Sequence, residues 1–125
     1  MNKITTEAEW AAVSGEQADK SILHIVEIFA SWCGPSIAVT STLTKIANEY
    51  AGRKIKFCQM DSSVSSETQK YANLSKPHFL IFRDGDLLEV VEGINAPLIE
   101  KLVADHIPDG MADDREDEAE DEEHS

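Results

Sequence analysis

The sequence predicts an α/β domain with a mixed central β-sheet and helices on both of its faces. Helical and strand patterns alternate along residues 1–108, and strands separated by helices are joined by right-handed parallel crossovers. Asp84-Gly85 then joins two strand patterns with the chemistry of a tight hairpin, which adds antiparallel pairing. The chain has 125 residues, 42% of them apolar, and this is enough for one domain with one core.

The first half of the chain predicts a short helix, a buried strand and a long helix. Residues 6–9 (Thr-Glu-Ala-Glu) match a capping box, so a short helix should start there and direct Trp10 and Val13 inward. Residues 22–29 are almost continuously apolar, which is typical of a central strand covered on both faces. Pro35 suits the first turn of the next helix, which carries an apolar stripe of Val39, Leu43, Ile46, Ala47 and Tyr50.

The second half predicts three more strands and two more helices. Strands are expected at residues 55–60, 78–82 and 87–91, and a weaker helix at residues 64–72. Asn95-Ala96-Pro97 combines a capping residue with a first-turn proline, so it should open the last helix. The apolar side of that helix comprises Leu98, Ile99, Leu102 and Val103. The pattern at residues 3–5 leaves open whether an edge strand forms there.

The negative charge is concentrated at one end of the chain. The formal net charge is −13, and ten of the 24 acidic residues, with a single arginine, lie in residues 109–125. This segment cannot bury enough apolar surface to offset its ordering entropy, so we divide the chain into a domain at 1–108 and a disordered acidic tail at 109–125. Such a tail either solubilises the chain or contacts a basic partner. The charge excludes a strongly basic nucleic-acid binder, and no apolar run is long enough to cross a membrane.

The two cysteines occupy different settings. Two cysteines cannot form a disulfide framework, and the first residues lack the apolar region of a secretory signal, so a reducing, cytoplasmic compartment is expected. Cys33 lies between a central strand and the first turn of a helix, where backbone amides favour a thiolate. The alternative interpretation is that Cys33 is a small buried residue of the core. Cys58 lies on a strand and should be a buried structural thiol. We expect no metal and no other cofactor.

Residues 30–35, Ala-Ser-Trp-Cys-Gly-Pro, resemble the active-site segment of the thioredoxin family. The order of the predicted elements matches that family over about residues 4–107. The resemblance implies the thioredoxin fold, with Cys33 as the redox-active thiol and a cis Pro77 facing it. It also places Glu27 at the position of the buried carboxylate of the family.

This chain departs from the family pattern at Ser36, directly after that segment, and at His78. Thioredoxins have a second cysteine where this chain has Ser36. The second thiol normally attacks the mixed disulfide formed by the first, and a hydroxyl cannot do so, which argues against a general disulfide reductase. His78 stands where thioredoxins usually have threonine, and it is either a partly exposed strand residue or a partner of the Cys33 thiolate.

Residues 92–98, Glu-Gly-Ile-Asn-Ala-Pro-Leu, are similar to a narrower group. This group comprises thioredoxin domains fused to nucleoside diphosphate kinase modules and thioredoxin-like light chains of axonemal outer-arm dynein. The resemblance implies a non-catalytic subunit of the ciliary axoneme that binds a dynein heavy chain and other outer-arm subunits. The expected contact surface surrounds Cys33 and comprises Trp32, Gly34, Pro35, Pro77 and Gly93. A monothiol exchange enzyme and a redox sensor acting through Cys33 are the alternatives.

Overall fold

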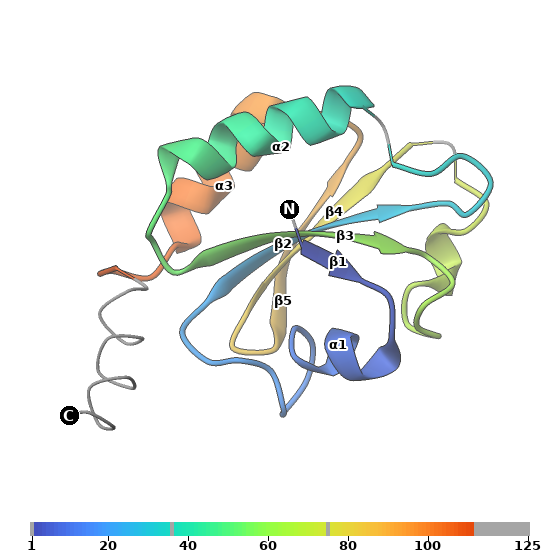
Figure 1. Cartoon of the computed structure of the whole chain (residues 1–125), viewed down its shortest axis with the longest axis horizontal. Helices are drawn as coiled ribbons and strands as arrows, with labels where there is room; N and C mark the ends of the chain where they lie inside the picture. Colours follow the sequence, from blue (N-terminus) through green and yellow to red (C-terminus); the bar gives the residue numbers. More distant parts are fainter. Residues whose placement is uncertain (1, 36, 75, 112–125) are drawn as a thin grey trace.

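The computed structural model describes residues 2–35, 37–74 and 76–111 (Figure 1). Its five-stranded sheet has the order β1-β3-β2-β4-β5, in which the first three strands are parallel and the last two antiparallel to their neighbours. The strands are β1 (Asn2–Ile4), β2 (Leu23–Phe29), β3 (Ile55–Asp61), β4 (His78–Arg83) and β5 (Asp86–Glu92). The predicted mixed sheet is therefore confirmed, and the edge strand that the sequence left open is present as β1.

Helices cover both faces of this sheet, as predicted. Helices α2 (Ile37–Glu49) and α3 (Ala96–His106) lie on one face, and α1 (Glu7–Ala11) lies on the other (Figure 1). Two apolar clusters fill the two sides. The α2/α3 side contains Leu23, Ile25, Val39, Leu43, Ile46, Phe57, Phe79, Ile81, Val91, Ile99, Leu102 and Val103. The α1 side contains Ile4, Trp10, Val13, Val26, Ile28, Cys58, Met60, Leu80 and Phe82.

Local capping explains where α1 and α3 begin. The Thr6 hydroxyl accepts a hydrogen bond from the Glu9 amide at 3.1 Å, and the Glu9 carboxylate accepts one from the Thr6 amide at 3.2 Å. This is the predicted capping box. Asn95 caps α3 by accepting a hydrogen bond from the Leu98 amide. Leu98 itself is 37% exposed, so the expectation that it faces the core was wrong.

The weak helix expected at residues 64–72 does not form. This described segment contains only a 3₁₀ turn, η1 (Gln69–Tyr71). Hydroxyl groups explain the difference, because serine and threonine side chains compete with the helix for backbone groups. The Thr68 hydroxyl donates to the carbonyls of Ser62 and Ser65, and the Ser65 hydroxyl accepts from the Glu67 amide.

The β4–β5 hairpin turns at the predicted dipeptide. Asp84 and Gly85 have φ values of 57° and 86°, the left-handed pair that a type I′ turn requires. The Gly15 amide donates to the Gly85 carbonyl at 3.0 Å. A side chain at position 85 would collide with the backbone of Gly15. Position 85 therefore needs glycine both for its positive φ and for this close approach.

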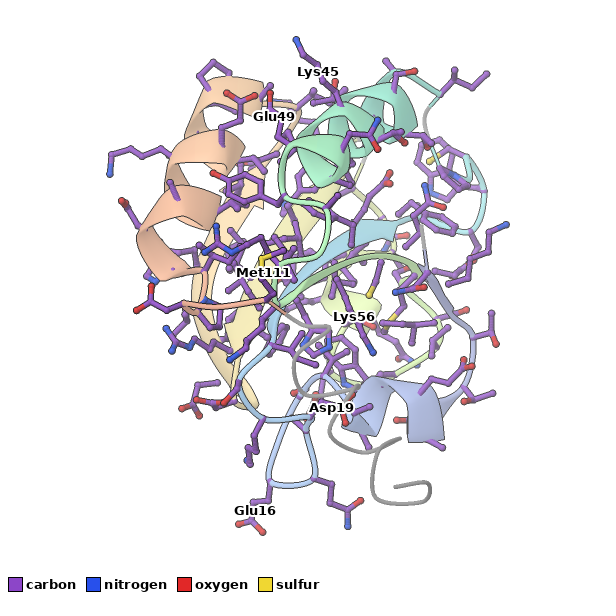
Figure 2. All side chains as sticks on the ribbon, turned by 60° about the vertical axis from the view of Figure 1, so that its left-hand side comes forward. Glu16, Asp19, Lys45, Glu49, Lys56 and Met111 are labelled. Atoms are coloured by element: carbon purple, nitrogen blue, oxygen red, sulfur yellow. The ribbon has the colours of Figure 1, made fainter. Side chains whose placement is uncertain are left out.

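The described chain continues past Pro108 along the turn between α2 and β3. The Arg53 guanidinium donates to the carbonyls of Pro108 and Gly110, each at 3.2 Å, and Arg53 pairs with Met111 in an isolated β-bridge. Figure 2 shows this face of the molecule, with Met111 and Lys56 labelled. The remainder of the predicted tail, 112–125, lies outside the described residues. Within the described ranges, no helix is long and apolar enough to span a membrane.

Candidate functional site

Cys33 lies on a turn that connects β2 to α2. The amides of Cys33 and Gly34 both donate to the Ala30 carbonyl, at 3.1 and 3.0 Å, and this holds the turn together. Gly34 has a φ of 68°, which glycine adopts without steric cost. The Cys33 thiol is exposed, and its sulfur lies 3.5 Å from the Ala30 carbonyl oxygen. Ser36, the predicted substitute for a resolving cysteine, lies outside the described residues.

A pocket of about 220 Å³ opens beside this thiol. It is lined by Glu27, Phe29, Ala30, Cys33, Gly34, Leu74, Lys76 and Pro77. The structure thus brings together four of the residues selected from the sequence: Glu27, Cys33, Gly34 and Pro77. Gly93 is linked to them because its amide donates to the Pro77 carbonyl at 2.8 Å. Sequence reasoning missed the wall formed by Phe29, Leu74 and Lys76, although Lys76 is the immediate neighbour of Pro77.

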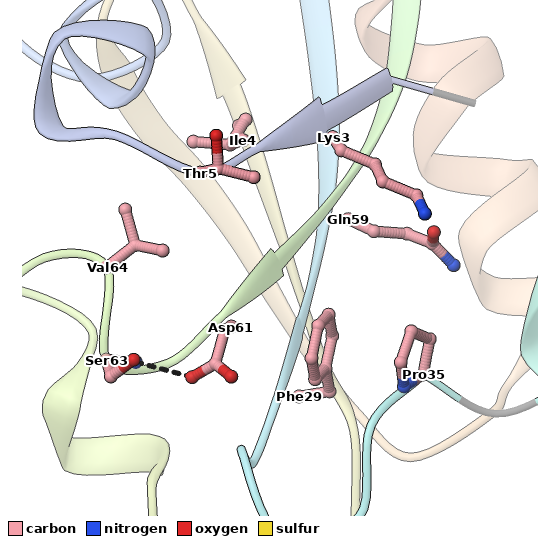
Figure 3. Close-up of a pocket in the computed structure, with 9 residues that line it drawn as sticks. All are labelled: Lys3, Ile4, Thr5, Phe29, Pro35, Gln59, Asp61, Ser63 and Val64. Atoms are coloured by element: carbon pink, nitrogen blue, oxygen red, sulfur yellow. Dashed lines mark hydrogen bonds between the residues drawn. The ribbon is translucent and has the colours of Figure 1, made fainter.

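Trp32 and Pro35 line two other hollows on either side of the Cys33 turn. The Trp32 side chain is 66% exposed, and its indole Nε1 donates to the Ala72 carbonyl at 3.1 Å. Pro35 lines a pocket of about 330 Å³ at the ends of β1 and β3, which Figure 3 shows. The other residues of that pocket are Lys3, Ile4, Thr5, Phe29, Gln59, Asp61, Ser63 and Val64.

Asp61 anchors the start of the Cys33 turn to the end of β3. Its carboxylate accepts a hydrogen bond from the Ser31 hydroxyl at 2.6 Å. It also accepts one from the Ser63 amide at 2.9 Å, which Figure 3 shows. Burial acts to raise the pKa of Asp61, but these hydrogen bonds to the charged form outweigh it and lower the pKa. Asp61 is therefore a stable acceptor at neutral pH, and it ties the segment before Trp32 to the sheet.

The Glu27 carboxylate is fully buried at the base of the Cys33 pocket. Its Oε1 accepts a hydrogen bond from Gln59 Nε2 at 3.2 Å, and the same amide donates to the Thr40 hydroxyl at 3.0 Å. The sequence analysis did not select Gln59. Gln59 pairs with Glu27 across β2 and β3, and directly paired residues of neighbouring strands share one face. The sequence carries no signal of this pairing, because it does not fix the register between strands.

His78 takes neither of the two positions expected for it. It is buried, and its ring centroid lies 4.7 Å from that of Tyr71. Its ring Nδ1 lies 3.2 Å from the Lys76 carbonyl oxygen. His78 pairs with Ile28, whose side chain packs in the α1-side cluster. Alternation along the strand therefore directs His78 to the face opposite Glu27, and the interpretation as a partner of Cys33 was wrong.

Cys58 is a buried thiol, as predicted. It is 3% exposed and packs in the α1-side cluster, and burial raises its pKa to about 11. It faces away from the Cys33 pocket because it follows Phe57 and precedes Gln59, which both face the α2/α3 side. Cys33 is thus the accessible thiol of the pair.

The expectation of a cis peptide bond before Pro77 was also wrong. The Lys76-Pro77 bond is trans, and the described residues contain no cis peptide bond. The trans form is the default for this bond, with a preference of about 0.5–1 kcal/mol. The expectation rested on the thioredoxin resemblance at a proline directly before a strand, and neither feature fixes the isomer.

No group of three histidine, cysteine, aspartate or glutamate side chains is placed to hold a metal ion within residues 2–35, 37–74 and 76–111. The candidate site comprises the exposed Cys33 thiol on a tight turn and the pocket beside it. The buried Glu27 carboxylate and Pro77 also line this pocket. This sheet order with a thiol at the turn between β2 and α2 defines a thioredoxin-fold protein.

Comparison with known proteins agrees with that class. The thioredoxin family model matches residues 3–105, and the chain belongs to the thioredoxin family. It is 36% identical over 105 residues to the flagellar outer-arm dynein 14 kDa light chain of Chlamydomonas reinhardtii, covering 84% of this chain and 80% of that one. A second flagellar outer-arm light chain of that alga, of 16 kDa, is 31% identical and covers 69% of this chain and 58% of that one.

Other relatives include longer proteins, and several solved thioredoxins share the fold. The human thioredoxin domain-containing protein 6 is 30% identical over 83% of this chain, which spans only 30% of that protein. Among solved structures, the thioredoxin of Trypanosoma brucei brucei has a TM-score of 0.62 at 28% identity, with 82% of this chain and 87% of that chain covered. The Malassezia sympodialis thioredoxin has a TM-score of 0.66 at 21% identity, covers 85% and 90% of the two chains, and supports the fold alone.

Proposed function

We propose that this chain is a non-catalytic light chain that docks on a dynein heavy chain in the outer arm of the ciliary or flagellar axoneme. The main support is the 36% identity that extends over 80% of a flagellar outer-arm dynein light chain. The similarity spans the whole thioredoxin domain and not only its active-site segment. The two light chains named in the comparison are flagellar, so the axoneme is the proposed location.

The thiol arrangement supports a binding role over general reduction. Cys33 is exposed while Cys58 is buried on the other face of the sheet, and the sequence has Ser36 where thioredoxins have a resolving cysteine. A mixed disulfide on Cys33 would then require an external thiol for its release. Docking needs only the fold and an exposed surface. We place that surface around the Cys33 turn, where the exposed Trp32 and the pocket flanked by Pro77 offer an aromatic anchor and a recess.

A second candidate is redox-sensitive binding or monothiol exchange through Cys33. The specific observation in its favour is the exposure of the thiol at the mouth of the 220 Å³ pocket. In this reaction the Cys33 thiolate attacks one sulfur of a partner disulfide, and the other sulfur leaves as a thiolate. A small thiolate then attacks the partner sulfur of the mixed disulfide, a disulfide forms between the small thiol and the partner, and Cys33 leaves as a thiolate.

The test of the light-chain proposal is sedimentation of axonemal extracts. Axonemes that contain a tagged copy of the chain are extracted with high salt and separated on a density gradient. The proposal expects the chain to sediment with dynein heavy chains, before and after treatment with a reductant. A chain found only at the top of the gradient contradicts docking. Loss of co-sedimentation in a Cys33→Ser variant, but not in Cys58→Ser, would favour the redox-sensitive form.

A further inference from the structure

The pocket of about 330 Å³ in Figure 3 lies at the carboxyl ends of the three parallel strands and shares only Phe29 with the Cys33 pocket. After β2 the chain turns toward α2, on one face of the sheet (Figure 1). After β3 it runs to Tyr71, which packs against the α1-side cluster on the other face. Neighbouring strands that diverge in this way leave a crevice at their carboxyl ends, where α/β proteins commonly bind ligands.

The strand register gathers several functional groups in this pocket. Lys3 pairs with Gln59 across β1 and β3, and Phe29 pairs with Asp61 across β2 and β3. Gln59 and Asp61 are two positions apart on β3, so their side chains leave the same face of the strand about 7 Å apart. All four residues line the pocket. An amide, a carboxylate, an ammonium and an aromatic ring therefore meet at one end of the sheet.

Two side-chain oxygens at this pocket accept no hydrogen bond in the part of the chain that the structure describes. Asp61 accepts from Ser31 and Ser63 through Oδ1, which leaves Oδ2 as a second acceptor. Gln59 is 7% exposed, and its Nε2 donates to Glu27, which leaves its Oε1 as an acceptor. The pocket thus offers one anionic and one neutral acceptor to a ligand that carries donors.

The charge of Asp61 is not balanced by a cation of the described chain. Lys3 lines the same pocket, but it forms no ion pair with Asp61 in residues 2–35, 37–74 and 76–111. Asp61 is ionised at neutral pH, because burial opposes but does not outweigh the hydrogen bonds that lower its pKa. Phe29 and Pro35 add apolar surface to the pocket. This combination matches the charge, the several N–H donors and the flat face of a guanidinium group.

We propose that this pocket binds an arginine side chain of a partner protein. The guanidinium donates to Asp61 Oδ2 and Gln59 Oε1, and its face lies against the Phe29 ring. Lysine is a weaker ligand, because its ammonium is a point charge without the planar fork. Lys3 is exposed and opposes any bound cation, so its removal strengthens binding. The proposal rests on this pocket alone and is independent of the dynein assignment.

A capped glycine–arginine–glycine tripeptide tests the proposal with the full, isotope-labelled chain, and amide chemical shifts in NMR spectra follow the binding. The matched control replaces arginine by citrulline, which has nearly the same shape without the charge. A third peptide has lysine at the centre. The arginine peptide should bind with a dissociation constant of about 1 mM, as expected for one anchoring residue. It should bind about fivefold more tightly than the citrulline peptide and about twofold more tightly than the lysine peptide.

The position of the shifts separates the pocket from the acidic C-terminal segment. Saturable shifts should occur at the amides of Thr5, Asp61 and Ser63, and they should shrink as salt is added. Shifts confined to residues 109–125 would show attraction to that segment only, and they would overturn the proposal. Equal binding of the arginine and citrulline peptides would overturn it as well.

Two variants with opposite expected effects locate the binding on the protein. Asp61→Asn keeps an acceptor for Ser31 and Ser63 but removes the charge, and it should weaken the arginine peptide about fivefold. Asp19→Asn is the matched control at an exposed position before the start of β2, and it should have no effect. Lys3→Gln should strengthen binding about twofold, because it removes a like charge.

The Lys3 variant also decides the case in which Asp61→Asn does not fold, because Lys3 is exposed on a short edge strand. Unchanged or weaker binding in Lys3→Gln refutes the proposal, and weaker binding would point to an anionic ligand instead. Unchanged binding in a folded Asp61→Asn variant refutes it independently.

Discussion

His24 should make the stability of the domain depend on pH. Its side chain is 2% exposed on β2, and burial, with a smaller contribution from the charge of Lys56, lowers its pKa to about 4. Asp19, which lies 4.0 Å from Lys56, opposes the shift. Lys56 and Asp19 are both labelled in Figure 2. In the unfolded chain the imidazole titrates near its ordinary pKa of about 6.5.

The unfolded chain therefore binds one more proton than the folded chain between these two pKa values. Stability is complete above about pH 6.5 and falls as the pH is lowered toward 4, because protonation of His24 favours unfolding. With the two pKa values above, the loss between about pH 7.5 and pH 5 is roughly 2 kcal/mol.

Denaturant unfolding of the wild type and of His24→Val, monitored by tryptophan fluorescence at each pH, measures this loss. Valine suits a buried strand position and cannot titrate. The wild type should lose about 2 kcal/mol more than the variant over the same pH range. Equal losses in the two proteins would refute the reasoning. Lys56→Met should reduce the pH dependence by a few tenths of a kcal/mol, and Lys45→Met, on α2, is its matched control.

Three further outcomes test the thiols and the C-terminal contact. The unmodified chain should not catalyse repeated reduction of insulin disulfides without a small thiol. Ser36→Cys should restore this activity, because a second thiol resolves the mixed disulfide. Repeated reduction by the unmodified chain would contradict the prediction. Iodoacetamide at neutral pH should label Cys33 before Cys58, since burial protects Cys58 and raises its pKa to about 11, and peptide mapping would expose the reverse order. Removal of residues 112–125 should barely change the melting temperature, because the segment has no bulky apolar side chain. Arg53→Ala should lower the free energy of unfolding by about 1 kcal/mol, because the carbonyls of Pro108 and Gly110 lose their donor. A truncation that destabilises the domain more than Arg53→Ala does would contradict both expectations.

Most of the fold could be predicted because local chemistry and tertiary packing agree. The capping box at Thr6, the apolar strand at 22–29 and the turn at Asp84-Gly85 each specify the structure that forms there. The helix expected at 64–72 did not form because the Thr68 and Ser65 hydroxyls bond to nearby backbone groups. The spacing of the apolar residues alone does not reveal that competition for backbone hydrogen bonds.

The site was less predictable because its geometry depends on which face each strand residue occupies. Cys33 and Glu27 line the same pocket because of their chain positions after and on β2. Gln59 was missed and His78 misassigned, since both depend on the register of β2 with its two neighbours. A one-residue change of register reverses the face of a side chain, and sequence spacing within one strand does not determine register between strands.

The separation between core and site explains how a thioredoxin domain can serve as a docking subunit. Neither apolar cluster includes Trp32, Cys33, Gly34 or Pro35, so the domain does not require the chemistry of this turn for its core. Buried core residues are constrained by packing, whereas exposed turn residues can change at little cost in stability. Replacement of a resolving thiol can therefore remove reductase activity while the fold and its surface persist. The exposed Cys33 remains able to form a mixed disulfide with a partner. A Cys33→Ser variant should therefore lose only redox-dependent contacts and keep the fold.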